Sequence, residues 1–219
     1  MRMRRKPWAR PELAACPFFV DRPEEWKGRW KEFFPRRQTV YLELGCGKGF
    51  FLAAAAAENP GVNYIGIDIN SDVLGVARRK IVQSYEAAGR PVDNLALLSH
   101  DIGRIDLMMD ENDRVERIYI HFCNPWPKAR HQKRRLTHPG MLARYAAFLP
   151  VGGEVYFKTD DVDLFAASLG YFRETGYEIL LRRDDLPADN EWDAYPTEHE
   201  NMFRKEEKPI HFLIARRAR

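Results

Sequence analysis

The chain repeats one hydrophobic pattern, in which short apolar runs are separated by longer segments of helical character. Apolar runs of about four to eight residues, bounded by turn-forming residues, are typical of strands that are covered on both faces. The pattern predicts seven strands, at 39–45, 62–69, 93–99, 115–122, 152–159, 177–183 and 209–217.

Helices are predicted in the segments between these strands, at 48–59, 71–89, 139–149 and 162–176. Ser71 is the expected N-cap of the second helix and Gly89 its expected stop. Strands that alternate with helices form a mostly parallel sheet with helices on both faces. The sequence therefore predicts an α/β fold.

The C-terminal part departs from this alternation. The last two predicted strands are separated by 184–208, which is long, polar and without an obvious helix. We therefore expect a terminal antiparallel strand, and we interpret 184–208 as an irregular functional loop. Residues 1–36, rich in arginine, proline and tryptophan, are interpreted as a basic N-terminal arm, and residues 37–219 as one Rossmann-like domain.

Charge distribution says more about partners than the total charge. The formal net charge of the 219 residues is only +3, but basic residues gather at both ends and in "KARHQKRR", 128–135. Local basic patches on a nearly neutral protein suit a polyanion that is held against one face. Three widely spaced cysteines indicate neither a disulfide framework nor a metal site, and no apolar run has the length of a signal peptide or membrane span. We therefore expect a cytoplasmic protein without a bound metal.

A glycine-rich turn follows the first predicted strand, in "LELGCGKGF". Gly45 and Gly47 allow positive φ and a close approach of a ligand to the backbone. The spacing is G-x-G-x-G rather than the G-x-G-x-x-G of dinucleotide-binding sites, and Glu43 precedes the first glycine by two positions. A carboxylate at this place repels phosphate but attracts an ammonium group, such as that of S-adenosylmethionine.

Two further acids stand at the ends of the next two strands. Asp68 can accept hydrogen bonds from both ribose hydroxyls, and Asp101 lies within reach of an adenine amino group. A glycine turn alone is also explained as a tight turn, but the carboxyl ends of neighbouring parallel strands meet in one crevice. The combination predicts a nucleoside-type cofactor and resembles the class I S-adenosylmethionine-dependent methyltransferases.

The fourth predicted strand runs into Asn124-Pro125-Trp126-Pro127 and then into the basic segment. The prolines stiffen the turn, and the Trp126 ring offers a surface on which a base can stack. We expect the basic side chains that follow to bind phosphate groups, which supply affinity and register rather than sequence readout. They are Lys128, Arg130, Lys133, Arg134 and Arg135, with His131 and His138 partly charged. The alternatives are a solvated basic surface and core packing of Trp126.

Two later stretches carry weaker signals. Asp160 ends the fifth strand at the same edge, although "TDDVDLF" equally fits a helix N-cap. In "PTEHENMF", Thr197, Glu198 and Glu200 can accept hydrogen bonds from the Watson–Crick edge of a guanine, but the spacing alone favours an ordinary loop.

Taken together, these motifs resemble one family, the bacterial tRNA (guanine-N7)-methyltransferases. "NPWPKARHQKRRL" is similar to the family segment D-P-W-x-K-x-R-H-x-K-R-R, and "TEHENMF" to T-x-[YF]-E-x-x-F. "RRKPWA", "LELGCGKGFFLA", "NYIGIDI" and "FKTDD" extend the resemblance over nearly the whole chain. It implies a class I methyltransferase that modifies a guanosine in the tRNA variable loop. It implies tRNA as the partner, no membrane, no obligate protein partner, and a monomer or homodimer.

The resemblance also assigns residues. It places Glu43, Asp68, Asp101 and Asn124 at the cofactor, and Lys128, Asp160 and 197–200 at the substrate. Asn124 is a departure, since the family usually has a catalytic aspartate there. Guanine N7 carries a lone pair and no proton, so attack on a methyl group requires no base. We therefore expect Asn124 to support catalysis, more slowly than aspartate, with negative charge from Asp160 or Glu200 nearby.

Two other functions fit parts of the sequence. Asn-Pro-aromatic also resembles the N-P-P-[YF] of enzymes that methylate exocyclic amines, although the single proline before Trp126 and the basic segment disfavour this reading. The other is a catalytically silent tRNA-binding homologue, because Asn124 replaces the aspartate. The first predicts a different methylated nucleoside, and the second predicts no detectable cofactor binding.

Overall fold

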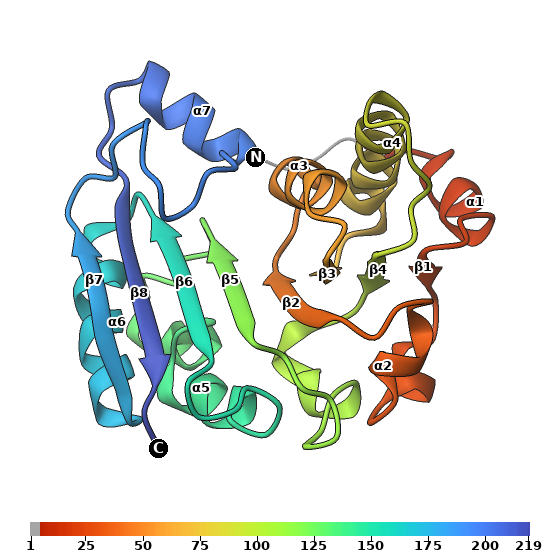
Figure 1. The fold of residues 1–219 in the computed structure, drawn as a ribbon. Coiled ribbons are helices and arrows are strands. Elements are labelled where there is room, and N and C mark those ends of the chain that lie inside the picture. The colour runs from red at the N-terminus through yellow and green to blue at the C-terminus, as the bar shows by residue number, and fades with distance from the viewer. Residues whose placement is uncertain (1–4) are drawn as a thin grey trace.

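The computed structural model describes residues 5–219, which form one eight-stranded sheet flanked by helices (Figure 1). The strand order is β1-β4-β3-β2-β5-β6-β8-β7. The strands are β1 (Phe19–Val20), β2 (Thr39–Leu44), β3 (Val62–Asp68), β4 (Leu95–Ser99), β5 (Arg117–His121), β6 (Glu154–Thr159), β7 (Tyr177–Arg183) and β8 (His211–Arg217). The α-helices are α1 (Ala9–Ala14), α2 (Trp30–Phe33), α3 (Phe50–Glu58), α4 (Ser71–Ala87), α5 (Pro139–Tyr145), α6 (Val162–Glu174) and α7 (Glu198–Lys205).

The predicted fold class is confirmed, with one strand more than expected. Strands β1 to β6 pair in parallel, and β8 runs antiparallel to both of its neighbours, β6 and β7. The additional strand is β1, whose Phe19 pairs with Leu97 of β4. Two residues are too few to show a periodic pattern, so this strand could not be read from the sequence.

The N-terminal segment is packed against the domain from residue 5 onward. The Lys6 N–H donates to Asp72 Oδ1 over 3.0 Å. Helix α1 lies so close to α4 that a Cβ added to Gly75 would come 2.5 Å from the Ala9 Cβ. The described part of the predicted arm thus contributes a strand, two α-helices and a 3-10 helix (Pro23–Trp26) to the same body, while its first four residues lie outside the described residues.

Two helix boundaries differ from the predictions. The N-cap of α4 is Asn70, one residue earlier than Ser71, and its side chain accepts from the Asp72 N–H, whereas Gly89 (φ 66°) follows the helix as expected. Helix α7 occupies part of 184–208, so the expectation of a wholly irregular segment is wrong. The Thr197 hydroxyl starts this helix by accepting from the Glu200 N–H, a capping interaction that the run of charged residues concealed.

The sheet separates two apolar clusters because successive strand residues point to opposite faces. Leu42, Leu44 and Ile120 belong to the cluster covered by α5, α6 and Trp30. Tyr64, Leu97 and Tyr119 belong to the cluster under α1, α3 and α4. Both faces are therefore filled, and the open rim at the carboxyl ends of the parallel strands remains for a ligand. Among residues 5–219, no helix combines the length and apolarity needed to cross a membrane.

Candidate active site

The glycine turn after β2 borders open space at Gly45 and Gly47 and is tightly packed at Gly49. Gly45 (φ 82°) and Gly47 (φ 53°) adopt left-handed conformations. A Cβ added to Gly45 would meet no heavy atom within 4 Å, and one added to Gly47 would meet only the Gly45 carbonyl, at 3.9 Å. At Gly49 the added atom would lie 2.8 Å from the Ala77 Cβ, so this glycine allows α3 to pack on α4. The first two glycines thus border space that a ligand can fill, as predicted for a cofactor turn.

Glu43 places an incompletely satisfied carboxylate under this turn. Its residue exposure is 3%, and its Oε1 lies 3.3 Å from His121 Nδ1. The other oxygen, Oε2, is buried without a hydrogen-bond partner among the described residues. Burial raises the pKa of this carboxyl group. A buried acceptor without a partner is unfavourable, and the α-ammonium group of S-adenosylmethionine would satisfy it, so the residues present fit this cofactor.

Asp68 is the last residue of β3 and Asp101 lies two residues after β4, at neighbouring positions of the same sheet edge. The half-buried Asp68 carboxylate accepts from the Gly47 N–H over 3.1 Å and from the Asn70 N–H over 2.9 Å. These two bonds fix its orientation beside the glycine turn. Asp101 is exposed and accepts from the Gly103 N–H over 2.9 Å. Both acids thus stand at the ends of neighbouring strands, on the rim where the sequence predicted them.

The loop after β5 is held in an unusual backbone conformation. Phe122 (φ 49°) and Trp126 (φ 44°) both adopt positive φ, although neither is glycine. Such conformations cost on the order of 1–3 kcal/mol each and gather at functional sites. Exposed Asn124 accepts the Trp126 N–H on its Oδ1 over 3.0 Å, and Arg135 Nε donates to the Pro125 carbonyl over 2.8 Å. The Asn124 side chain is thus fixed at the rim, one strand away from the end of β2.

The basic segment divides into exposed and structural side chains. Lys128, Arg130, Lys133 and Arg134 are exposed and form no ion pair with the described residues. Trp126 is half-buried, with the Arg134 guanidinium 5.1 Å from its ring centre. Arg135 is only 4% exposed, and half-buried His138 caps α5 through its Nδ1, so both have structural contacts that the sequence did not predict. Their sequence context is the same as that of the exposed residues, and only the tertiary contacts separate them.

The acid pair after β6 resolves an alternative that the sequence left open. Asp161 caps α6 by accepting the Leu164 N–H on Oδ1 over 2.7 Å. Asp160 is exposed and is not used by the cap. One aspartate therefore stabilises the helix, and the other is free to face a substrate at the same edge.

Helix α7 lies beyond the upper ends of β6 and β8 in Figure 1. Glu198 Oε1 accepts from Lys48 Nζ over 2.7 Å, which joins the helix to the glycine turn. Glu200, which the sequence suggested as a direct base contact, is 2% exposed, and its two oxygens are bound by Lys158 and Arg204 at 2.8 and 2.7 Å. In this conformation Thr197 caps α7, and Glu200 anchors the helix through its buried contacts.

Sequence reasoning missed three buried polar residues at this edge: His121, Lys158 and Asp193. His121 is the last residue of β5, and Lys158 directly follows the apolar run 155–157 of β6. A titratable residue in a strand covered on both faces was therefore the available signal. Asp193 carried no such signal, because it lies in a segment that is polar throughout.

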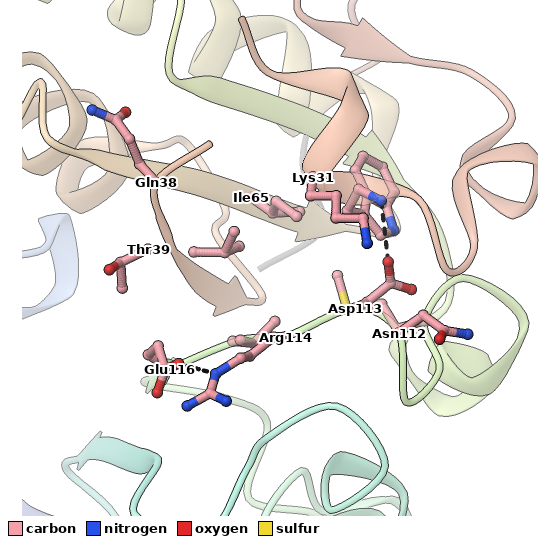
Figure 2. A pocket seen from close by; sticks show the side chains of 12 residues that line it. Lys31, Gln38, Thr39, Ile65, Asn112, Asp113, Arg114 and Glu116 are labelled. Atoms are coloured by element: carbon pink, nitrogen blue, oxygen red, sulfur yellow. Dashed lines mark hydrogen bonds and ion pairs between the residues drawn. The ribbon is translucent and has the colours of Figure 1, made fainter. Parts of the chain in front are cut away.

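Two cavities lie outside the cofactor rim. The larger, about 270 Å³, opens at the amino ends of β2 and β5, where Gln38, Thr39 and Glu116 line it (Figure 2). None of the predicted site residues is among its walls. The other, about 260 Å³, lies between the basic segment and the start of α6 and is lined in part by Pro127, Arg135 and Asp161. Within residues 5–219, no group of three or more metal-ligating side chains is arranged to hold a metal ion.

Comparison with solved structures assigns the class of the fold. A structure titled an antibiotic-related methyltransferase superimposes with a TM-score of 0.61 at 15% identity, covering 83% of this chain and 88% of the other. The 16S rRNA methyltransferase KamB gives a TM-score of 0.58 at 16% identity, with 83% and 89% covered. At such identities the likeness concerns the fold, which is that of the Rossmann-like methyltransferases.

Sequence comparison assigns the family. A family model described as putative methyltransferase matches residues 37–213. The tRNA (guanine-N(7)-)-methyltransferase of Clostridium beijerinckii is 54% identical over 215 residues, 98% of each chain. That of Acetivibrio thermocellus is 48% identical over 98% of this chain and 99% of the other. The chain belongs to the tRNA (guanine-N(7)-)-methyltransferase family.

Proposed function

We propose that this protein transfers a methyl group from S-adenosylmethionine to N7 of a guanosine in the variable loop of tRNA, forming 7-methylguanosine in the cytoplasm. The observation that carries the proposal is the pairing of β2 with β5, in which Leu44 lies opposite Ile120. This pairing brings the strand ends that bear Glu43 and Asn124 to one rim, with the exposed cations directly after it. The names of the relatives support the same substrate and position.

Methyl transfer to N7 makes modest chemical demands on the protein. Bound S-adenosylmethionine supplies an electrophilic methyl group on a sulfonium. The guanine N7 lone pair forms the new C–N bond as the C–S bond breaks, and no proton leaves the base. Orientation is therefore the main contribution of this chain, and near-attack positioning is worth roughly 7–11 kcal/mol in favourable cases. Asn124, fixed by the Trp126 N–H, provides an amide at the rim for this purpose.

Each predicted residue takes a role that agrees with its surroundings. Glu43, Gly45, Gly47, Asp68 and Asp101 surround the cofactor position, and Lys128, Arg130 and Arg134 bind tRNA phosphates. Asp160 supplies negative charge near the methylated base, which gains positive charge. Thr197 and Glu198 place α7 over the same rim, and Glu200 anchors that helix to β6 through its contact with Lys158. We expect a monomer or homodimer without an obligate protein partner.

The direct test combines purified protein, S-adenosylmethionine and a tRNA transcript, followed by digestion and mass spectrometry of the nucleosides. The proposal predicts 7-methylguanosine. A methylated exocyclic amine would instead support the reading based on Asn-Pro-Trp. Normal tRNA binding with no methylated product and no binding of S-adenosylhomocysteine would identify a silent homologue.

A further inference from the structure

A continuous series of buried ionic groups runs from the cofactor turn to α7. The distances are 3.3 Å from Glu43 Oε1 to His121 Nδ1 and 3.1 Å from His121 Nε2 to Asp193 Oδ2. Lys158 Nζ then lies 2.9 Å from the same Asp193 oxygen and 2.8 Å from Glu200 Oε2. Each step is within ion-pair distance, and we call these five residues the buried ion chain.

The buried ion chain differs from ordinary surface ion pairs in its low solvent exposure. Lys158 is 0% exposed and Glu200 2%, and the other three members do not exceed 7%. Surface ion pairs contribute roughly 0–1 kcal/mol, but a buried charge that loses its partner costs on the order of 3–5 kcal/mol. The members of the buried ion chain therefore cannot move independently of one another.

The members come from five separate parts of the sequence that meet only in the fold. Glu43, His121 and Lys158 come from β2, β5 and β6, and Asp193 and Glu200 come from the late loop and α7. One end, Glu43, has the partnerless oxygen beside the cofactor turn. The other end, Glu200, is a buried residue of α7 that Arg204 also binds. The buried ion chain thus joins the glycine turn to α7.

We propose that His121, Asp193 and Lys158 form a positioning unit that couples cofactor binding at Glu43 to the placement of α7, and thereby to tRNA binding. This inference rests on the proposed function for the identity of the two ligands. None of the three residues touches the reacting atoms, because all three lie below the surface.

The coupling follows from charge balance. Three carboxylates, on Glu43, Asp193 and Glu200, face Lys158, Arg204 and the imidazole of His121. A neutral imidazole carries one N–H, whereas both ring nitrogens of His121 face carboxylates, so the protonated ring satisfies the chain better. A cation that arrives at Glu43 changes the attraction between Glu43 and His121, and therefore between His121 and Asp193. The change reaches Lys158 and Glu200 through groups that water does not screen.

The test measures thermodynamic coupling rather than activity. The affinity for S-adenosylhomocysteine is determined by calorimetry with and without saturating tRNA, and the ratio of the two Kd values gives the coupling. We expect tRNA to tighten binding by about fivefold or more in the unaltered protein. Asp193→Asn and Glu200→Gln, which cut the chain at its middle and at its α7 end, should bring the ratio close to one.

A matched control exists in the same segment. Asp184 forms an exposed pair with Arg182, with 70% of the aspartate side chain accessible. Asp184→Asn should keep the ratio of the unaltered protein. Thermal unfolding identifies which chain variants are folded, and either one suffices for the test. A folded variant that keeps the full ratio, or an unaltered protein with a ratio of one, overturns the inference. Failure of the unaltered protein to bind S-adenosylhomocysteine at all would count against the proposed function instead.

Discussion

The cations of the basic segment and those of the buried ion chain are the same residue types in opposite environments. Lys128 and Arg130 are exposed and unpaired among the described residues, whereas Lys158 has no exposed surface and lies between two carboxylates. The contrast even separates sequence neighbours, since Arg134 faces solvent and Arg135 holds the Pro125 carbonyl. Burial therefore decides whether a cation in this protein is available to RNA or committed to the fold.

The two environments respond differently to salt. Exposed charges are screened over about 10 Å at 0.1 M salt, and buried pairs are screened much less. RNA binding should weaken as salt rises, because phosphate contacts release counterions. The buried ion chain should keep α7 in place over the same range. The following predictions test this division, beginning with the largest effect.

Glu43→Gln alters an end member of the buried ion chain, and we expect it to have the largest effect, on cofactor affinity. The substitution keeps the size of the side chain but removes the charge that the cofactor ammonium requires. A hydrogen bond between charged groups contributes about 1.5–3 kcal/mol, so S-adenosylhomocysteine affinity should fall about 10- to 150-fold in calorimetry. Glu178→Gln, which removes an exposed partner of Arg216, is the control and should bind normally. Equal affinities for the unaltered protein and Glu43→Gln would refute the role of this carboxylate.

The adjacent arginines provide the sharpest form of the comparison. Arg135→Ala removes a buried side chain and leaves the carbonyl of half-buried Pro125 without its donor, so the free energy of unfolding in urea should fall by about 1–3 kcal/mol. Arg134→Ala should change stability by less than about 0.5 kcal/mol. It should instead lower the slope of log K against log salt for tRNA by about 0.7–0.9. The reverse pattern would show that the exposed and structural roles are interchanged.

Substitutions of Asn124 test the chemistry at the rim, between the basic segment and the buried ion chain. Asn124→Asp places a carboxylate where the methylated guanine gains positive charge. A gain of about 1.4 kcal/mol in the transition state would raise kcat about tenfold, as measured in single-turnover methylation assays. Asn124→Ala should be slower than the unaltered protein, because it also loses the bond to the Trp126 N–H. If Asn124→Ala is as fast as the unaltered protein, Asn124 has no part in positioning.

The last prediction concerns the pH dependence of stability. Burial alone would lower the pKa of His121, but the adjacent carboxylates of Asp193 and Glu43 outweigh this effect and raise the pKa above its ordinary value of 6.5. The stabilisation is therefore present below pH 6.5 and is lost as the pH rises through the folded-state value. Burial also raises the pKa of Glu43, which gives a loss of the same sign.

The measurement is the free energy of unfolding in urea between pH 6 and pH 9. The decline with rising pH should be less steep in His121→Asn, by up to about 1.4 kcal/mol per pH unit, the linkage of one proton. His199→Asn, at an exposed position of α7, should retain the original slope. Parallel curves for His121→Asn and the unaltered protein would contradict a protonated His121 in the chain.

The sequence placed the glycine turn and the acids at the strand ends correctly because their signals are local. The apolar runs located β2 to β6, and acids at strand ends must meet when the strands are parallel and adjacent. Glu43 and Asp68 could thus be placed near one turn without knowledge of any side-chain contact. The glycine spacing pointed to the open backbone that Gly45 and Gly47 provide.

The structure around α7 and the basic segment was predicted less completely, because the interactions there join segments that are distant in the sequence. Lys158 and Asp193 are paired only once β6 and the late loop are folded together. Helix α7 contains eight residues, and only Met202 and Phe203 among them are apolar, which is too few to show a helical repeat in the sequence. The separation of Arg134 from Arg135 likewise depends on tertiary contacts, such as the bond from Arg135 to the Pro125 carbonyl. Local sequence identifies the residue types here but not their burial.

The central claim is that cofactor and base meet at the carboxyl rim between Glu43 and Asn124. A crystal structure with bound S-adenosylhomocysteine tests it most directly. The account predicts the α-ammonium group on Glu43 Oε2, the ribose hydroxyls on Asp68 and the sulfur facing Asn124. A cofactor bound elsewhere, for example in the cavity at the amino ends of β2 and β5, would contradict it.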